Sequence, residues 1–291
     1  MTRRYGWVLN LDAELELARG RPGYVPRRKL LQQLREHGAS SRQLLALGDV
    51  LIEPGGEAPP GLVGRAWCPT PLALAKLQAA GVAPEPHPDA AVLRRVNHRL
   101  FAHQLGGGLA HQAYVTNRDE LSRLLGDCNR NWLVKRPLEF AGRGQLRALG
   151  PLTEKQWSWV DASFERDGLL IEPLVSIALE VSLHGFVRPD GGHELGRICA
   201  QQVSERGAFR NVRLLKPGEL RPDEASAFEE RATAAATALH RAGYFGPFGI
   251  DGYRYELEGA RGFCALGELN ARYTLGFVTG FPRHPSELHL S

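Results

Sequence analysis

The sequence predicts an α/β protein, in which short strands and amphipathic helices alternate along the chain. Apolar segments typical of strands, such as Leu169–Val175, recur between segments with helical spacing, such as Pro222–Ala242. A proline-rich stretch at Pro84–Pro88 interrupts this pattern and predicts a domain boundary. The 291 residues suffice for one large or two medium domains. We therefore expect a small α/β domain at residues 1–88 and a larger one at residues 89–291.

The small domain is expected to combine two strands and two helices. One helix follows Thr70 and Pro71, which supply an N-cap and a proline at the first helical position. The other carries leucines at helical spacing and stops at Gly38. The expected strands are Tyr5–Asn10 and Asp49–Glu53, and the expected helices are Pro26–His37 and Leu72–Ala80.

The larger domain is expected to open with one helix that runs from Asp89 to Leu105. Asn117 and Thr153 each precede a Glu or Gln by three residues, which indicates capping boxes at the starts of two further helices. The polar segment Ser204–Arg213 suits a mobile loop. The remaining expected elements are a helix at Pro222–Ala242 and strands at His111–Val115, Asn131–Lys135, Leu169–Val175, Ile177–Val187 and Leu195–Val203.

Composition excludes several classes of protein. The net charge of +4 would suit a polyanionic ligand such as a nucleotide, but no basic run with interleaved aromatic residues predicts a nucleic-acid partner. No stretch has the apolar length of a signal peptide or a membrane span, so we expect no membrane association. The four cysteines are far apart and form no metal-binding pair, which predicts a reduced, cytoplasmic protein without disulfides or zinc.

Two acidic residues near the end of the chain are predicted to face each other across a hairpin. Phe248–Leu257 and Phe263–Ala271 have the alternation of strands. If Gly259 and Ala260 form the loop, so that the flanking charges Glu258 and Arg261 pair, Asp251 lies directly opposite Glu268. Side chains alternate with period two, so Asn270 and Arg272 share this face.

Facing carboxylates repel each other, and a bound cation removes that cost. Mg²⁺ binds one or two carboxylates together with phosphate oxygens and waters. The set Asp251, Glu268 and Asn270 therefore predicts a magnesium site, with the charge of Arg272 just beyond it. The alternative is a surface hairpin whose charges are solvated.

A second group of residues is suited to phosphates. Lys135 ends an apolar strand, and a turn with Gly142, Arg143 and Gly144 follows. Consecutive backbone N–H groups in such a turn can bind phosphate oxygens, with the lysine as a point charge. The alternative is a lysine that only extends to solvent. The turn matches neither the dinucleotide fingerprint nor the P-loop, which argues against a Rossmann dehydrogenase. The sequence also lacks a Gly-x-Ser-x-Gly motif, which argues against a serine hydrolase.

The strand at Leu169–Val175 breaks at a proline, which would expose main-chain groups able to bind an adenine edge. We call the segment Glu172, Pro173, Leu174 and Val175 the hinge segment. Glu180, in the following strand, could accept hydrogen bonds from ribose hydroxyls. Alternatively, Glu172 and Glu180 are ordinary edge charges.

The order of these motifs along the chain resembles the ATP-grasp superfamily, which includes D-alanine–D-alanine ligase and biotin carboxylase. The resemblance covers roughly residues 89–276, and Gly249–Asp251 followed by Glu268–Arg272 is its most specific part. It implies two α/β subdomains, at about 89–172 and 173–291, that clasp ATP, preceded by a small pre-ATP-grasp domain. Many members carry a phosphate-binding lysine where this chain has Arg99.

The resemblance also implies residue roles. Lys135 and Arg99 would contact phosphates under the Gly142–Gly144 loop, the hinge segment would bind adenine and Glu180 the ribose. Asp251, Glu268 and Asn270 would hold Mg²⁺, and Arg272 would stabilise charge that develops in the reaction.

The implied activity is an ATP- and Mg²⁺-dependent ligase that converts a carboxylate to an acyl phosphate and joins it to an amine. Its substrates would be small molecules or a peptide, and a homodimer is one assembly that the sequence leaves open. Arg206, Arg210 and Arg213 are candidates for binding an anionic substrate. The alternatives are a kinase that phosphorylates a hydroxyl and a nucleotide-binding regulatory protein without turnover.

Overall fold

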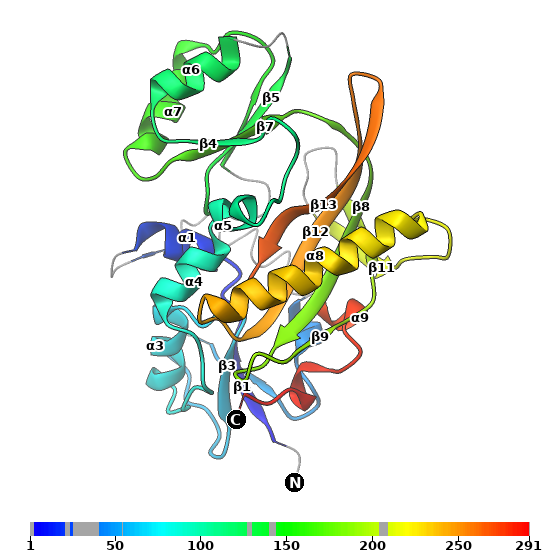
Figure 1. The fold of residues 1–291 in the computed structure, drawn as a ribbon. Helices are drawn as coiled ribbons and strands as arrows, with labels where there is room; N and C mark the ends of the chain where they lie inside the picture. Colours follow the sequence, from blue (N-terminus) through cyan, green and yellow to red (C-terminus); the bar gives the residue numbers. More distant parts are fainter. Residues whose placement is uncertain are drawn as a thin grey trace.

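The structure is a computed structural model, which describes residues 3–20, 24–25, 41–53, 55–126, 130–139, 144–203 and 209–290. Within them the chain forms three β-sheets flanked by helices (Figure 1). The predicted α/β class is therefore confirmed.

The N-terminal unit is a parallel sheet of order β2-β1-β3 with helices beside it. Tyr5 and Trp7 on the central strand are fully buried, which explains why this short apolar segment forms a strand. Both predicted strands and the helix after Pro71 are confirmed, whereas the predicted helix at Pro26–His37 lies outside the described residues. The elements are β1 (Tyr5–Val8), α1 (Ala13–Arg19), η1 (Arg42–Leu44), β2 (Val50–Leu51), β3 (Val63–Ala66) and α3 (Pro71–Ala79).

The long helix predicted from Asp89 is in fact two helices, α4 (Ala90–Asn97) and α5 (Arg99–Gln104). At His98 the backbone is extended, with ψ of 130°. Its Nδ1 accepts a hydrogen bond from the Leu100 amide at 3.1 Å, so the side chain caps the second helix. The break has no proline or glycine to signal it.

A four-stranded antiparallel sheet of order β4-β7-β5-β6 follows, with two helices on one face (Figure 1). It has its own core, centred on Trp132, Val134 and Ile171. The capping box predicted at Thr153 is confirmed. The strand β6 was not predicted. The elements are β4 (Ala113–Val115), α6 (Arg118–Gly126), β5 (Trp132–Lys135), β6 (Gln145–Ala148), α7 (Glu154–Phe164) and β7 (Leu169–Pro173).

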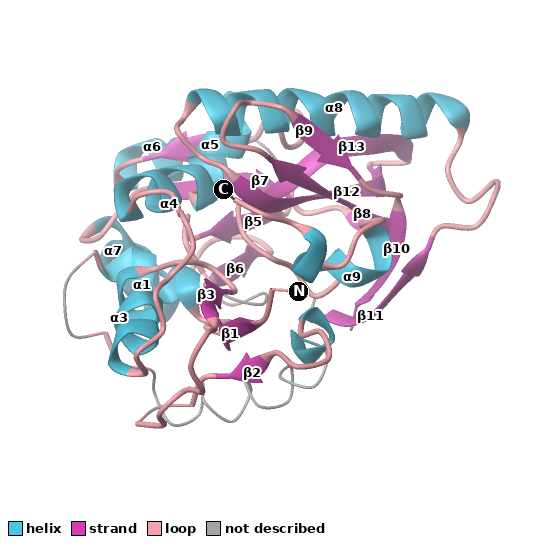
Figure 2. Ribbon diagram, turned by 90° about the horizontal axis from the view of Figure 1, so that it is seen from below, coloured by secondary structure: helices cyan, strands magenta, loops and turns pink. Residues whose placement is uncertain are grey.

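The largest sheet has the order β11-β10-β8-β12-β13, with β9 paired to β8, and the long helix α8 lies along one of its faces (Figure 2). Residues 209–213, predicted as part of a mobile loop, instead belong to the edge strand β11, which pairs with β10; residues 204–208 lie outside the described part. The elements are β8 (Ser176–Val187), β9 (His193–Leu195), β10 (Cys199–Val203), β11 (Phe209–Leu214), α8 (Pro222–Arg241), β12 (Gly246–Leu257), β13 (Ala260–Asn270), α9 (Phe277–Gly280) and η2 (Pro285–Glu287).

The predicted pairing of Asp251 with Glu268 is confirmed, but the predicted loop is wrong. Leu257 pairs with Ala260, so the loop is Glu258–Gly259, and both of its residues have positive φ, at 51° and 83°. Compared with the predicted loop, this turn shifts the pairing of β12 with β13 by two residues. An irregularity in the ladder between Asp251 and Tyr253 shifts it back by the same amount.

The N-terminal unit packs onto the large sheet through one continuous core. The ring centroids of Trp7 and Tyr273 lie 5.3 Å apart, and Leu93 and Val96 of α4 belong to the same cluster. The helices α4 and α5 therefore pack with the large sheet, whereas β4–β7 have a separate core. The domain boundaries given above remain predictions.

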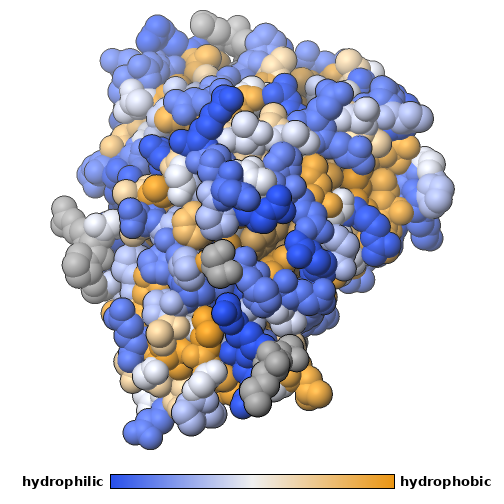
Figure 3. Space-filling model, turned by 60° about the horizontal axis from the view of Figure 1, so that its bottom comes forward, coloured by the Kyte–Doolittle hydropathy of each residue, from blue (hydrophilic) through white to orange (hydrophobic). Residues whose placement is uncertain are grey.

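On the face shown in Figure 3, hydrophilic residues predominate and apolar residues gather in separate patches. Among the described residues, no helix combines the length and apolar character needed to cross a lipid bilayer.

Arg65 of β3 links the C-terminal segment of the chain to the N-terminal sheet through hydrogen bonds. Its side chain is only 1% exposed and makes two hydrogen bonds of 2.7 Å to Glu85. It also donates to the carbonyls of Pro285 and Leu288, and its guanidinium lies 3.7 Å from the centre of the Tyr5 ring. Among the described residues, Glu85 is therefore the one carboxylate that neutralises this buried charge.

Replacing Glu85 by alanine is expected to lower the free energy of unfolding by about 3 kcal/mol, because the Arg65 charge stays buried without its partner. Urea denaturation measures this change. The control is Glu57→Ala, which removes an exposed carboxylate and should change stability by less than about 0.5 kcal/mol. Equal losses in the two variants would contradict the expectation.

Candidate active site

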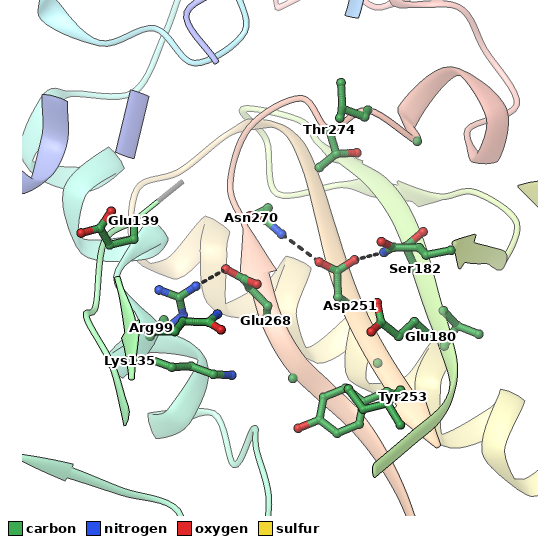
Figure 4. Close-up of a pocket in the computed structure, with 18 of the residues that line it drawn as sticks. Arg99, Lys135, Glu139, Glu180, Ser182, Asp251, Tyr253, Glu268, Asn270 and Thr274 are labelled. Atoms are coloured by element: carbon green, nitrogen blue, oxygen red, sulfur yellow. Dashed lines mark hydrogen bonds and ion pairs between the residues drawn. The ribbon is translucent and has the colours of Figure 1, made fainter. Parts of the chain in front are cut away.

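A cavity of about 350 Å³ lies between the four-stranded sheet and the large sheet. Figure 4 shows charged side chains from both sides pointing into it. The predicted site residues that line it are Arg99, Lys135, Glu172, Pro173, Leu174, Val175, Glu180, Asp251, Glu268, Asn270 and Arg272.

The floor of the cavity is built by residue alternation on three neighbouring strands. Asp251 on β12 pairs with Ser182 on β8 and with Glu268 on β13. Two residues along, Gly249 pairs with His184 and with Asn270. Because alternate residues share a face, these rows lie side by side on the floor, roughly 7 Å apart.

The two facing carboxylates differ in their proton affinity. Burial, followed by the charge of Glu268, raises the pKa of Asp251 to about 7. Burial also acts to raise the pKa of Glu268, but the charges of Arg99, Lys135 and Arg272 outweigh it and leave that pKa below its usual range. A cation between the carboxylates would favour the charged form of Asp251 and so lower its pKa.

Arg99 and Gln201 orient these carboxylates. Arg99 donates to Glu268 Oε1 at 3.0 Å and to the Arg136 carbonyl at 2.6 Å. Gln201 donates to Asp251 Oδ1 at 2.5 Å. The break at His98 starts α5 at Arg99 and so brings this guanidinium to the floor of the cavity.

Arg272 is held from several directions. It donates to Glu14 of α1, to Asn270 Oδ1 at 2.9 Å and to its neighbour's carbonyl at 3.0 Å. Its guanidinium lies 5.5 Å from the ring centre of Trp67. A fixed cation at the cavity is therefore supported by the N-terminal unit, and Glu14 is a partner that sequence reasoning missed.

The residues at the floor of the cavity fit Mg²⁺, provided that the side-chain amide of Asn270 rotates. Asp251 and Glu268 offer carboxylate oxygens beside a cavity that has room for phosphate oxygens and waters. Asn270 turns its amide nitrogen toward Asp251 Oδ2, at 3.2 Å, and its oxygen toward Arg272. The amide must rotate before its oxygen can reach a metal between the carboxylates. The described residues hold no cluster of three His, Cys, Asp or Glu side chains that could bind a metal by itself.

On the opposite wall, Lys135 and the hinge segment lie together. Lys135 Nζ is 2.5 Å from Glu172 Oε1, and both side chains are largely buried. The Leu174 amide donates to the Asn131 carbonyl at 2.9 Å, so this N–H is not free to bind a ligand. Burial and the charge of Glu268 raise the pKa of Glu180, and Lys135 partly offsets this.

Not all predicted site residues line the cavity. Arg213 forms an ion pair of 2.5 Å with Glu219 and is not among the cavity-lining residues, so its predicted role with substrate has no support in this geometry. Gly144 is also outside the lining; its carbonyl accepts from the Arg136 amide at 2.9 Å. Gly142, Arg143 and Arg206 lie outside the described residues, as does the side chain of Arg210.

Several lining residues were missed by sequence reasoning. Ser182 and His184 follow Glu180 at intervals of two, so strand alternation could have identified them. Gln201 pairs with Glu180 across strands that adjoin only in the folded sheet. The other lining residues that had not been predicted include Leu11, Trp67, Glu139, Gln145, Tyr253 and Thr274.

Comparisons with solved structures identify the fold, whereas comparisons of the sequence find no match. No model of a known protein family matches the sequence, and no curated protein sequence is significantly similar to it. Solved structures do match. The D-alanyl-alanine synthetase A from Vibrio cholerae has 13% identity and a TM-score of 0.59, over 99% of this chain and 94% of that one.

Two further structures are similar. The N5-carboxyaminoimidazole ribonucleotide synthetase from Thermus thermophilus has 19% identity and a TM-score of 0.56, over 98% of this chain and 76% of that one. The biotin carboxylase domain of the Hydrogenobacter thermophilus 2-oxoglutarate carboxylase, determined with MgADP and bicarbonate, has 12% identity and a TM-score of 0.57, over 95% and 66%. The chain thus has the ATP-grasp fold, as the order of its motifs predicted.

Proposed function

We propose that this protein is an ATP- and Mg²⁺-dependent ligase that activates a carboxylate as an acyl phosphate and joins it to an amine or another nucleophile. The observation that carries the proposal is the row formed by Asp251 and Glu268 on the floor of the cavity, with Arg272 beyond it and Lys135 on the opposite wall. Two facing acids near fixed cations suit a metal-bound polyphosphate.

In the proposed reaction, a carboxylate oxygen attacks the γ-phosphorus of ATP and ADP leaves. The amine nitrogen then attacks the carbonyl carbon, the C–O bond breaks, phosphate departs and the amine loses a proton to water. Bound Mg²⁺ would neutralise phosphate charge and orient the transferred group. Lys135 and Arg99 would bind phosphate oxygens, which requires each to leave or share its present carboxylate partner.

The remaining residues would position the reactants. The hinge segment would bind adenine through Val175 and main-chain carbonyls rather than the Leu174 amide, and Glu180 the ribose. Arg272 would face the oxygen that becomes negative when the amine attacks, where a fixed cation lowers the barrier most. Its three hydrogen-bond partners keep it oriented before the reaction begins.

ADP release across a panel of carboxylates in the presence of hydroxylamine tests this proposal. Hydroxylamine intercepts acyl phosphates, so ATP-dependent hydroxamate formation is the expected result. A stable phosphorylated product without hydroxamate would instead identify a kinase. Binding of Mg·ATP without turnover on any carboxylate or hydroxyl compound would favour a regulatory nucleotide-binding protein.

Asn270→Ala tests the metal site separately. It is expected to weaken Mg·ATP binding roughly 10- to 100-fold, measured by calorimetry, because Asn270 contacts both Asp251 and Arg272. The matched control is Asn211→Ala, an exposed asparagine on the edge strand β11, which should bind as wild type does. If Asn270→Ala also binds Mg·ATP as tightly as wild type, the assigned metal site is wrong.

A further inference from the structure

His184 occupies a slot that three glycines keep open. A Cβ on Gly249 would come within 3.1 Å of the His184 Nδ1, on Gly276 within 2.6 Å of Nε2 and on Gly280 within 2.5 Å of Cδ2. The histidine is only 2% exposed. Burial lowers the pKa of His184 to about 4, so the imidazole is neutral at physiological pH. The surrounding chain is thus shaped to hold an uncharged ring.

Both ring nitrogens of His184 meet hydroxyl groups. Thr274 Oγ1 lies 2.9 Å from Nδ1, and Ser182 Oγ lies 3.2 Å from Nε2. A neutral imidazole donates through one nitrogen and accepts through the other, so it fixes the orientation of both hydroxyls together. Ser182 and Thr274 both line the cavity.

His184 and Thr274 lie at the end of the cavity floor that is farther from Glu180. His184 pairs with Gly249, one row beyond the row of Ser182 and Asp251 and away from Glu180. In Figure 4, Thr274 lies on one side of Asp251, and Glu180 and Tyr253 lie on the other. If Glu180 binds the ribose as proposed, the nucleotide occupies its side of the cavity. Thr274 then lies at the other side, where Arg272 and the second substrate would meet.

We propose that His184 is a positioning residue that holds the Thr274 hydroxyl, with Ser182 as its second anchor, toward the reacting carboxylate of the substrate. This role rests on the ligase reaction proposed above. The hydroxyl supplies a neutral hydrogen bond to the carboxylate or acyl-phosphate oxygen beside Arg272, which orients the group without adding charge. His184 itself stays behind the hydroxyls and does not touch the reacting atoms.

Four variants separate positioning from packing. His184→Phe keeps a flat ring and removes both hydrogen bonds. His184→Asn places an amide near the Nδ1 position, within reach of Thr274, whereas His184→Gln places one near the Nε2 position, within reach of Ser182. Thr274→Val removes the hydroxyl itself and leaves the imidazole in its slot.

The readouts are kcat for hydroxamate formation with the best carboxylate of the panel, KM for that carboxylate and for ATP, and the melting temperature. His184→Phe and Thr274→Val are each expected to lower kcat about tenfold or more, with KM for ATP changed less than about twofold. His184→Asn should recover most of the loss and His184→Gln should not. The double variant His184→Phe/Thr274→Val should be no worse than Thr274→Val alone, because both changes act through one hydroxyl.

Three results would overturn this role. Wild-type kcat in folded His184→Phe would show that the ring contacts are dispensable. Equal losses in His184→Asn, His184→Gln and His184→Phe that follow their melting temperatures, with Thr274→Val fully active, would identify a packing role. If wild type neither binds Mg·ATP nor forms any hydroxamate, the ligase proposal itself fails and this role with it, and that result cannot be confused with the first two.

Discussion

Replacing Asp251 by asparagine is expected to remove catalytic turnover while making the metal-free protein more stable at pH 8. The half-buried carboxylate lies opposite Glu268, and its pKa is raised to about 7, so at pH 8 the folded protein holds a second negative charge beside the first. Asparagine has the same shape and no charge, and its oxygen can still accept from Gln201. The same change removes a carboxylate that we assign to Mg²⁺, so turnover should fall more than about 100-fold.

The sign of the pH effect follows from proton linkage. The ordinary pKa of an aspartate, which the unfolded chain has, is 3.8, and in the folded protein it is about 7. Between these values the folded state binds the proton and the unfolded state does not, so this group's contribution to stability falls as pH rises from about 4 to about 7. The asparagine variant lacks this loss.

The measurement is the difference in melting temperature between Asp251→Asn and wild type, with chelator present, at pH 5 and pH 8. The difference should become more positive at the higher pH. Asp119→Asn, which removes an exposed carboxylate from α6, should show no such trend. A variant that is less stable than wild type at pH 8, or that retains more than about a tenth of wild-type turnover, would contradict the assignment.

The hairpin shows how far sequence reasoning reached and where it failed. Alternation and turn chemistry predicted that Asp251 faces Glu268, and the structure agrees. The predicted loop was wrong because Glu258 adopts positive φ, which a non-glycine residue seldom does. The compensating irregularity between Asp251 and Tyr253, where β13 has two more residues than β12, leaves no mark in the residue pattern, since extra residues in a strand resemble their neighbours. The agreement therefore came from two shifts that cancel.

Other parts of the site depended on contacts between distant segments. The order of Lys135, the hinge segment and the two acids indicated the fold, because each motif is local. The partners that orient these groups come from elsewhere: Glu14 reaches Arg272 from the first helix, and Gln201 reaches Asp251 from a neighbouring strand. Such pairings exist only after the sheets have packed, so no spacing in the sequence predicts them.

Replacing Arg272 by methionine is expected to lower kcat at least about 100-fold, because it removes the fixed cation from the place where negative charge develops. Arg272→Lys should be nearly as inactive. A lysine keeps the charge, but its three N–H donors share one nitrogen, whereas the guanidinium reaches Glu14, Asn270 and the Tyr273 carbonyl from three different nitrogens. Hydroxamate formation measures both variants.

The methionine variant also carries a stability cost that must be separated from catalysis. Glu14 is 5% exposed, and its Oε2 has no hydrogen-bond partner among the residues that the structure describes, so removing Arg272 leaves a buried carboxylate without its cation. We expect a loss of about 3–5 kcal/mol in the free energy of unfolding. The double variant Glu14→Leu/Arg272→Met replaces the pair by apolar side chains and should regain most of that stability.

The double variant decides between the two roles of Arg272. If the arginine acts on the reaction, Glu14→Leu/Arg272→Met stays inactive although it folds as well as wild type, and it still binds Mg·ATP. If the arginine only anchors the N-terminal unit to the sheet, activity returns together with stability. Recovery to within about tenfold of wild-type kcat would therefore remove Arg272 from the reaction and leave the Asp251–Glu268 row as the catalytic part of the floor.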